Sequence, residues 1–596
     1  MTKRKRSIGG GWRQFAVADD PSDIVEREGE EEVLAVEYLF QWAWGTTAIP
    51  SSAALCCRLA RRALQQGVRT PLMEALALGH NDFRSRVDAN ATRCLRNALV
   101  SWADPRALLT SVAGSSVDTV ALPHTVFATI AKRSPVEFLE RLGADRAGVR
   151  RFWEQLLETR EGQAMALVHG HVRGKSLDEL EMYIPLAIHE DSAPCSKNDS
   201  AVVRDWFSLL ARGGTDLQCR YLITSYIKSK HATMNDKSWP LVLDSFERLH
   251  RGTDDAGEPL VNLGGTEWRA ILLFSCMDME WYVNDLGFSS WSSTDICAFC
   301  PANRTDYDFK NMRRCAPWRT RMYSNTQFMA HLRKEHPLST YAGFSVFFPR
   351  LDSMHVQDYN GNAANVCGNA LWLLLTGSGS TVPGDSREAR LQTINAKLRS
   401  YYTRNKVKNR IGDLRIGNIL KPGKMTTAYP FLAGKRIKAA NTRALCPFVL
   451  ELCQLHRDVP PSPACDSRLA ALEALVEYYQ ITYRAGMFLT DLEKQKLSNA
   501  VLKMGAHFQA LHLQALEADQ LLWNIRPKAH YGQHLVSQAR LINPKLLTCY
   551  LPESLTGKVA NVVKAVLNGQ SSVHHGVPRA TMERWAVALH CSTARG

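Results

Sequence analysis

The chain lacks the features that mark several large protein classes. No apolar run approaches the eighteen residues that a helix needs to cross a bilayer. The first residues contain no apolar stretch of the signal-peptide kind, and no G-x-S-x-G motif or catalytic cysteine signature supports a serine or cysteine hydrolase. We therefore expect neither a membrane protein nor a secreted protein, and no internal repeat indicates a solenoid.

Cysteine is too sparse and irregular to build a disulfide framework. Fifteen cysteines are spread over 596 residues, which suits a reducing compartment and an intracellular protein. The length and the hydrophobic content of 45% predict large cores and three or more domains or subdomains.

Acidic residues are scarce between residues 397 and 443. This segment holds thirteen Lys or Arg and one acid, Asp413, and it supplies most of the net charge of +15. A basic segment interleaved with aromatic side chains is typical of surfaces that bind nucleic-acid phosphates, although a solvated basic loop without specificity is the alternative. The interleaved aromatic residues are Tyr401, Tyr402, Tyr429 and Phe431. The residues predicted to contact phosphate are Arg404, Lys406, Lys408, Arg410, Lys435 and Arg436.

One pair of cysteines has the spacing of metal ligands. Cys297 and Cys300 form a C-x2-C turn, and His331 and His336 lie five residues apart further along the chain. Two thiolates and two imidazoles make a tetrahedral Zn²⁺ site, and the long intervening segment favours a structural role. Cys315 is a competing ligand. The alternative is that these are reduced core cysteines and surface histidines.

Two apolar runs end in aspartate. Residues 270–277 read as a buried strand that stops at Asp278, and the run YIPLAIHED stops at Asp191. Aspartates at the ends of neighbouring strands can hold Mg²⁺ or Mn²⁺ and support attack on a phosphodiester by two ions about 4 Å apart. Taken alone, an aspartate in such a place is also a common former of solvated turns.

The order of these parts resembles the transposase domain of CACTA (En/Spm-like) and related cut-and-paste DNA elements. A strand ending in Asp278 is followed by a tryptophan-containing C-x2-C segment and then by a D-x-M-H motif, Asp352 to His355. A later segment, WNIRPKAHYGQHL at residues 523–535, is similar to a Pro-Lys-x-His block of transposon-derived relatives. The resemblance spans roughly residues 180–560. It implies an RNase H-like fold with Asp191 and Asp278 as the first two catalytic acids.

The third acid of the implied DDE triad has two candidate positions. Glu517, on a long helix before the Pro-Lys-x-His block, is the preferred choice, although a solvated helix face is its plain alternative. The other position falls on Asn441, whose amide cannot replace a carboxylate at a metal. Ser192 also stands where the family pattern has glycine. An intact triad predicts DNA strand cleavage and transfer, and a lost acid predicts an inactive, zinc-stabilised nucleic-acid-binding protein.

His355 and Asp352 are expected to support the catalytic edge. They lie three residues apart, so the histidine can hydrogen-bond the carboxylate from one helical turn away. In the families that the chain resembles this pair is organisational, so we expect neither residue to be a nucleophile. A histidine that caps a buried helix is the alternative interpretation.

The expected fold class is α/β. It comprises an RNase H-like mixed sheet with an inserted zinc-binding and helical region, and an N-terminal all-α domain. The expected divisions are a disordered segment 1–32, a helical domain 33–175, a first part of the core 176–280, an insertion 281–465 and a C-terminal helical part 466–596. DNA is the expected partner, and a homo-oligomer is compatible with the sequence. The KRKR stretch at residues 3–6 predicts a nuclear location.

Overall fold

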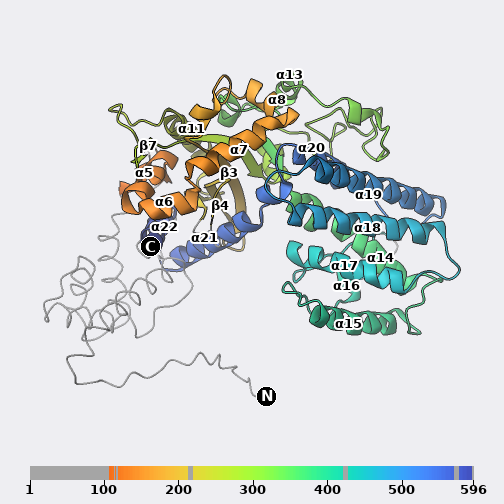
Figure 1. The fold of residues 1–596 in the computed structure, drawn as a ribbon. Helices are drawn as coiled ribbons and strands as arrows, with labels where there is room; N and C mark the ends of the chain where they lie inside the picture. Colours follow the sequence, from red (N-terminus) through yellow and green to blue (C-terminus); the bar gives the residue numbers. More distant parts are fainter. Residues whose placement is uncertain are drawn as a thin grey trace, which may run out of the picture. The chain divides into compact units, whose positions relative to one another are not determined.

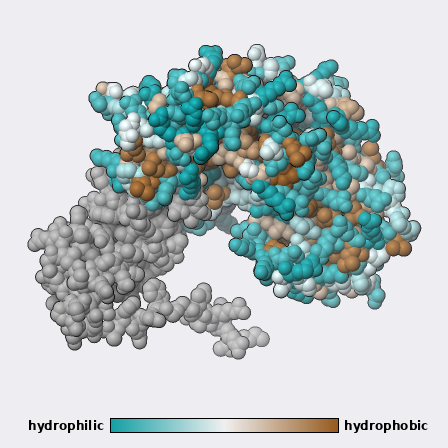
Figure 2. All heavy atoms as spheres, in the orientation of Figure 1, coloured by the Kyte–Doolittle hydropathy of each residue, from teal (hydrophilic) through white to brown (hydrophobic). Residues whose placement is uncertain are grey.

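The computed structural model describes residues 107–112, 115, 118–212, 219–420, 427–569 and 576–593. Leu108–Met582 form one compact unit. The predicted disordered segment 1–32, most of the predicted helical domain 33–175 and the basic residues 3–6 lie outside the described residues. Among the described residues, no helix combines the length and apolarity that a membrane span needs. Apolar residues on the face drawn in Figure 2 form separate patches among hydrophilic ones.

A mixed five-stranded sheet lies at the centre of this unit, in the order β5-β4-β3-β8-β9 (Figure 1). Strands β3, β4 and β5 are antiparallel, whereas β8 and β9 run parallel to β3 and to each other. The expected α/β class is therefore confirmed. The strands are β3 Tyr183–Pro194, β4 Ser200–Ser208, β5 Tyr221–Ile227, β8 Arg269–Met277 and β9 Pro349–Leu351.

The apolar runs of the sequence form the central strands. Every residue of β8 after Arg269 is buried, which requires cover on both faces of the sheet. Helix α11 (Ala232–Arg251) packs against β8, and helix α21 (Tyr550–Gly569) packs against β3 and β4. The short hairpins are β1 Leu109–Ser111 with β2 Thr119–Ala121, and β6 Asn262–Leu263 with β7 Thr266–Glu267.

The helices that precede the sheet belong to the same compact unit. Trp153 donates its indole N–H to Tyr183 O at 2.9 Å, and Ser208 Oγ donates to Leu142 O at 2.7 Å. The predicted division at residue 175 therefore does not separate the described part of the helical region from the sheet. These helices are α5 Pro123–Arg133, α6 Pro135–Leu142, α7 Arg146–Glu158, α8 Arg160–Val168 and α9 Leu177–Leu180.

The predicted insertion 281–465 contains the edge strand β9, so it is not one continuous insertion. A first segment joins β8 to β9, and a second, helical segment joins β9 to α21. The first segment holds α12 Met279–Asn284, η2 Pro317–Thr320, α13 Asn325–His331 and η3 Pro337–Thr340. The second holds η4 Met354–Asp358, α14 Asn362–Thr376, α15 Arg387–Arg404, α16 Ile416–Ile419, α17 Ala439–Leu455, α18 Pro463–Arg484, α19 Asp491–Glu517, α20 Pro527–Ala539 and η5 Pro544–Leu547. The last helix is α22 Val577–Thr593.

Local signals account for the two longest helices of the second segment. Ser462 caps α18 through Cys465 N, and Thr490 and Glu493 form a capping box at the start of α19. Apolar and aromatic residues form a stripe along α18 at steps of three and four residues, which places them on one face of the helix. Leu469, Leu472, Val476 and Tyr479 of this stripe are buried, whereas its last member, Tyr483, is 43% exposed.

A charged network lies buried between β3 and β4. Asp205 accepts hydrogen bonds from Arg220 at 2.6 Å and from His189 at 2.9 Å, and its side chain is completely buried. Burial opposes ionisation, but the charges of Arg220 and His189 hold the pKa of Asp205 below its usual range. Removal of one partner from such a network leaves the other charges buried without compensation.

We therefore expect Asp205→Ala to lower the free energy of unfolding by about 3 kcal/mol or more. Thermal melting of the full chain measures this loss. The matched control is Asp413→Ala, because Asp413 pairs with Arg399 at an exposed site. Exposed pairs contribute little, so the control should melt like the parent. Equal losses in the two variants would contradict the importance of the buried network.

Candidate functional site

A buried cluster of two cysteines and two histidines joins distant parts of the chain. The ligand atoms of Cys297, Cys300, His530 and His534 all lie within 4.8 Å of one another, and all four residues are buried. Both histidines come from α20, where a separation of four residues places them on the same helix face. The cluster is compatible with zinc.

The distances in this cluster match those of a tetrahedral zinc site. Cys297 Sγ lies 3.3 Å from His534 Nε2, Cys300 Sγ lies 3.4 Å from both Nε2 atoms, and the two Nε2 atoms are 2.9 Å apart. Zn–S bonds of about 2.3 Å and Zn–N bonds of about 2.0 Å give tetrahedron edges of roughly 3.3–3.8 Å. The four donors therefore need to move by only a few tenths of an ångström to hold the ion.

The protonation of the cluster also suits a cation. Burial lowers the pKa of His530 to about 4, which leaves its imidazole neutral. Burial disfavours a Cys297 thiolate, but a hydrogen bond from Cys300 and the adjacent imidazoles hold the pKa of Cys297 well below its usual range. Burial and the Cys297 sulfur raise the pKa of Cys300. The pair thus shares one proton, which a metal ion would displace on binding.

Neighbouring side chains hold the cluster in place. The Trp318 ring lies 4.3 Å from the His530 ring, and the Phe299 ring lies 5.8 Å from the His534 ring. Phe299 N donates to Cys297 Sγ at 3.3 Å, and the Tyr531 hydroxyl donates to Ile296 O in the cysteine turn. These contacts fix both halves of the cluster before any ion binds.

The predicted histidine ligands were wrong. His331 is exposed, donates from Nδ1 to Gln327 O and stacks on Tyr323. His336 is buried, but its Nδ1 accepts from Leu338 N, and its ring packs against Trp239. Cys315, the competing ligand, is exposed. The histidines that lie beside the cysteines, His530 and His534, are more than two hundred residues further along the chain, where a local spacing rule does not search.

Asparagines of α14 position the segment that leads into α20. Asn365 Nδ2 donates to Asn524 O at 2.8 Å, and Asn369 Oδ1 accepts from Trp523 N at 2.8 Å. Asn362 Nδ2 donates to Lys528 O at 3.2 Å. The Pro-Lys-x-His block is therefore held by its backbone against a helix from the D-x-M-H region.

Helix α20 also accepts hydrogen bonds from the edge strand β9. Leu351 N donates to Gln538 Oε1 at 2.8 Å, and Arg350 donates to Gln538 O at 2.6 Å. One residue of α20 thus satisfies backbone and side-chain donors of the edge strand β9. Since the metal ligands lie on the same helix, the Cys–His cluster connects the segment between β8 and β9 with the end of β9.

Aspartates lie at a similar level on three neighbouring parallel strands. The prediction that the first of these strands stops at Asp191 is wrong, because β3 continues to Pro194. Ile188 of β3 pairs with Ser275 of β8, so Asp191 and Asp278 each lie three residues further on. Met277 pairs with Leu351 of β9, so Asp278 and Asp352 are the next residues on their strands. Burial and the nearby Asp278 charge raise the pKa of Asp191. The two predicted aspartates therefore lie close together near the carboxyl ends of β3 and β8, and we call this end of the sheet the acidic edge.

The three aspartates have different surroundings. Asp278 Oδ1 caps α12 by accepting from Trp281 N at 2.7 Å, and Asp191 accepts from Ser192 N. Asp352 accepts from the backbone N–H groups of Met354, His355 and Cys549 and from His355 Nδ1 at 2.6 Å. Asp352 is thus saturated by donors, whereas Asp191 and Asp278 keep oxygens for another ligand.

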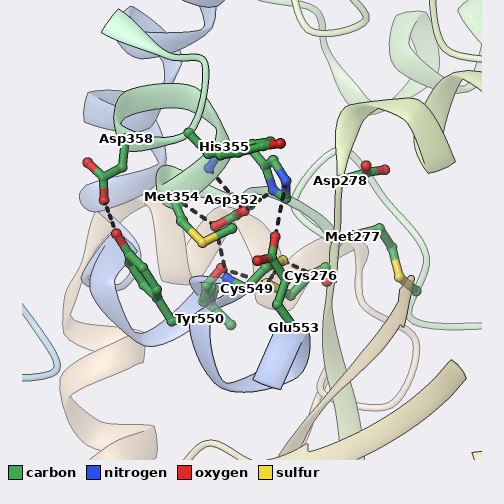
Figure 3. Close-up of polar contacts among 12 residues, drawn as sticks. Cys276, Met277, Asp278, Asp352, Met354, His355, Asp358, Cys549, Tyr550 and Glu553 are labelled. Carbon is green, nitrogen blue, oxygen red and sulfur yellow. Dashed lines mark hydrogen bonds and ion pairs between the residues drawn. The ribbon is translucent and has the colours of Figure 1, made fainter. Parts of the chain in front are cut away.

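His355 lies between Asp352 and Glu553, a fourth acidic residue that comes from α21 (Figure 3). Its Nδ1 faces Asp352, and its Nε2 lies 3.2 Å from Glu553 Oε1. Burial opposes the charged ring, but Asp352, Glu553 and Asp278 raise the pKa of His355 to about 9. Partial burial, opposed by His355 and reinforced by Asp191 and Asp352, raises the pKa of Glu553 to about 7. The hydrogen bond predicted between His355 and Asp352 is present.

The structure places neither predicted third acid at this edge. Glu517 is the exposed last residue of α19, and Asn441 caps the start of α17 by accepting from Lys438 N. Glu553 was missed by sequence reasoning, because it lies in the first turn of an ordinary amphipathic helix. The backbone of Cys549, just before α21, donates to Asp352 at 3.0 Å, and this contact fixes where the helix begins.

Two further groups face the acidic edge. His189 lies on the same strand face as Asp191, its Nδ1 is held by Asp205, and its Nε2 is buried without a hydrogen-bond partner. Lys528 donates to Tyr359 O, and burial lowers its pKa to about 8 even though Asp352 and Asp278 oppose this shift. Both residues supply hydrogen-bonding capacity close to the carboxylates.

Comparison with protein-family models and with curated proteins gives no match. The site is therefore interpreted from its own geometry.

The predicted phosphate-binding cations are exposed on the surface, whereas two of the four predicted aromatic residues are buried. Tyr401 and Tyr402 are buried, so they cannot stack on bases. The guanidinium of Arg404 pairs with Glu451, and Arg410 donates to Val407 O. All six predicted cations are exposed, namely Arg404, Lys406, Lys408, Arg410, Lys435 and Arg436.

The cluster predicts one tightly held zinc ion. We expect Cys297→Ser and His534→Ala to lose this ion and to melt at a lower temperature, because the ion links segments more than two hundred residues apart. Elemental analysis of the purified full chain measures the metal content. The control is His331→Ala, which removes the predicted but exposed histidine and should keep the ion. Loss of zinc in the control alone would contradict the assignment.

The His355–Asp352 pair predicts a pH dependence of stability. The folded pKa of His355 is about 9 and its ordinary value is 6.5, so its stabilising contribution is complete below about pH 6.5 and is lost as the pH rises through 9. The shift corresponds to about 3 kcal/mol. We expect His355→Gln to destabilise the chain strongly at pH 6 and little at pH 10 in melts without added Mg²⁺.

An Asp352→Asn background serves as the control for this pH effect. There the ring has lost its main partner, so the difference between His355 and Gln should become nearly independent of pH. A destabilisation that grows with pH in the parent background would contradict the imidazolium assignment.

Proposed function

We propose that the chain is a DDE-type transposase-like protein that cleaves and transfers DNA strands, with Asp191, Asp278 and Glu553 as its metal-binding acids. The observation that carries this proposal is the shared level of Asp191 and Asp278 on adjacent parallel strands. Glu553 reaches the same edge from α21 and interacts with the Asp191 carboxylate. Glu553 replaces Glu517 as the third acid.

The topology of the sheet supports this proposal. Three antiparallel strands are followed by a helix and then by two parallel strands on the other side of the first strand. We propose that this is an RNase H-like sheet, in agreement with the fold that the CACTA-like motifs imply. In this interpretation the first and fourth strands deliver aspartates and a later helix delivers a glutamate.

The residues of the edge have separable tasks. When bound, two Mg²⁺ or Mn²⁺ ions would activate water or a 3′-hydroxyl and stabilise the leaving oxygen. Asp191, Asp278 and Glu553 would hold such ions through carboxylate oxygens. His355 orients Glu553, and Asp352 orients His355. Lys528 is placed to neutralise part of the negative charge at the edge.

Substrate binding would draw on the exposed basic segment. The six predicted cations are exposed, so they could contact DNA phosphates without the loss of a buried interaction. The Cys–His cluster would hold the zinc-binding segment against α20 and thus stabilise the edge without taking part in the chemistry. A DNA substrate is consistent with the nuclear location proposed from residues 3–6.

The contact between His355 and Glu553 favours a second candidate function. A glutamate held in an ion pair at 3.2 Å is less available to a divalent ion. A protein with this arrangement would keep the zinc-stabilised fold and bind nucleic acid without cleaving it. The two functions differ in whether divalent ions act at the edge.

A plasmid-nicking assay in Mg²⁺ or Mn²⁺ separates the two functions. We expect the parent to nick DNA and the variants Asp191→Asn, Asp278→Asn and Glu553→Gln to fall to background. His355→Gln should lose about 10- to 100-fold, as expected for a residue that orients a ligand. Glu517→Gln is the matched control and should keep full activity.

Other results of the nicking assay would change the assignment of the acids or of the function. Activity that survives Asp278→Asn, or is lost in Glu517→Gln, would overturn the assignment of the acids. A parent that shifts DNA in a gel but never nicks it would support the second candidate. Zinc content should be equal in all variants, so that a loss of activity cannot be ascribed to loss of the Cys–His cluster.

A further inference from the structure

A buried carboxylate without a task in the proposed function lies six residues after Asp352. Asp358 is the last residue of η4, and only 3% of its surface is exposed. Tyr479 of α18 and Tyr550 of α21 donate their hydroxyls to its two oxygens, and Figure 3 shows the bond to Tyr550. Asp358 therefore joins the segment after β9 to a core helix and to the helix that carries Glu553.

The two tyrosines act as donors to this carboxylate. Burial and the charge of Asp358 raise the pKa values of Tyr479 and Tyr550 well above their ordinary value, so both hydroxyls keep their protons. Burial raises the pKa of Asp358 to about 7, although the two hydroxyls and Arg443 oppose this shift. Arg443 Nη1 lies 3.8 Å from Asp358 and donates to the Tyr483 hydroxyl. The tyrosine hydroxyls, at hydrogen-bonding distance, therefore hold the carboxylate more directly than the guanidinium does.

Two adjacent residues at the start of α21 are held by the short segment after β9. Cys549 N donates to Asp352 Oδ1 at 3.0 Å. The Tyr550 hydroxyl donates to Asp358 Oδ2. Glu553 N then donates to Cys549 O at 2.8 Å, which begins the hydrogen bonding of the helix. One anchor on the backbone and one on a side chain fix where the helix begins and how it is rotated about its axis. Glu553 lies less than one helical turn beyond Tyr550, so a change at either anchor would move it.

The burial of Asp358 is unfavourable for stability alone. A carboxylate loses its hydration in such a place, and hydrogen bonds from neutral hydroxyls replace that hydration only in part. An apolar side chain would pack η4 against α18 without this loss. It would not direct the hydroxyl of Tyr550, however, so only non-directional contacts would set the rotation of α21. A directional acceptor at this position therefore indicates a positioning role.

We propose that Asp358 is a positioning residue that sets the place of Glu553 through the hydroxyl of Tyr550. The bond from Tyr479 anchors the carboxylate to α18, and the bond from Tyr550 transmits its position to the first turn of α21. The placement of Glu553 beside His355 follows from this contact. Its consequence for metal binding rests on the proposed function, in which Glu553 is the third acid.

A matched pair of tyrosine variants tests this proposal. Tyr550→Phe and Tyr479→Phe each remove one hydroxyl from the same carboxylate, so they should lower the melting temperature by similar amounts. Only Tyr550→Phe should speed amide exchange in peptides covering residues 549–556, by about fivefold, which is the effect of one net hydrogen bond. Hydrogen–deuterium exchange of the full chain without metal or DNA measures this difference. Equal exchange of these peptides in the two variants would overturn the proposal.

A double variant shows whether Tyr550 acts through Asp358. Asp358→Ala should speed exchange in the same peptides, and the addition of Tyr550→Phe should cause no further increase, because both changes remove one shared contact. Additive increases would show that the two residues act separately and would contradict the proposal. If Asp358→Ala does not fold, the comparison of Tyr550→Phe with Tyr479→Phe still decides the result.

The metal requirement of plasmid nicking separates positioning from a general loss of stability. We expect Tyr550→Phe to raise the Mn²⁺ concentration for half-maximal nicking by about 10-fold, as partners of a metal ligand do, and to regain most of the parent rate at saturating Mn²⁺. Tyr479→Phe should keep the parent requirement. An unchanged requirement in Tyr550→Phe would contradict the proposal. A parent that does not nick would overturn the proposed function instead, and the exchange measurement would still decide whether Asp358 positions α21.

Discussion

The parallel pairing of β3 with β8 is the constraint on which the acidic edge depends. Its register brings Asp191 and Asp278 to one level, although 87 positions separate them in the chain. The pairing is stabilised by burial of β8 on both faces, and a slip of one residue would turn Asp191 and Asp278 to opposite faces of the sheet. The packing of the hydrophobic core therefore determines where the two acids lie. Burial and, to a smaller extent, repulsion from Asp278 raise the pKa of Asp191, so holding the ionised pair at this place costs free energy that the core must offset.

The Cys–His cluster extends this constraint to the rest of the edge. It ties the segment after β8 to α20, and Gln538 of the same helix satisfies the donors of β9. The chain then passes through η5 to Cys549, whose backbone binds Asp352, and enters α21 with Glu553 in its first turn. The zinc-compatible cluster and the acidic edge are thus mechanically linked through one helix and one short connection.

Sequence reasoning succeeded where the signal was local. The buried strand that stops before Asp278, the C-x2-C turn and the Asp352–His355 pair are each defined within about ten residues. It failed for ligands brought together by tertiary structure. His530 lay within a motif that was recognised, yet the spacing rule favoured His331 and His336 because they were nearer to the cysteines. Glu553 has no motif at all, since an acid in the first turn of a helix is ordinary capping chemistry. β9 has only three residues, too few for a periodic pattern, so it was placed inside an insertion.

The aspartates on the three parallel strands show why residue type alone does not define a metal ligand. Asp352 follows β9 in the same way that Asp278 follows β8, but four donors occupy its oxygens. Those donors include the first turn of η4 and the N–H of Cys549, which is nearly two hundred residues away. A carboxylate saturated in this way gains little from a cation and instead fixes the charge and orientation of His355. Asp191 and Asp278 accept fewer such bonds, so their oxygens are less occupied by donors of the protein. The number of donors, which the fold decides, separates the supporting acid from the acids that can bind metal.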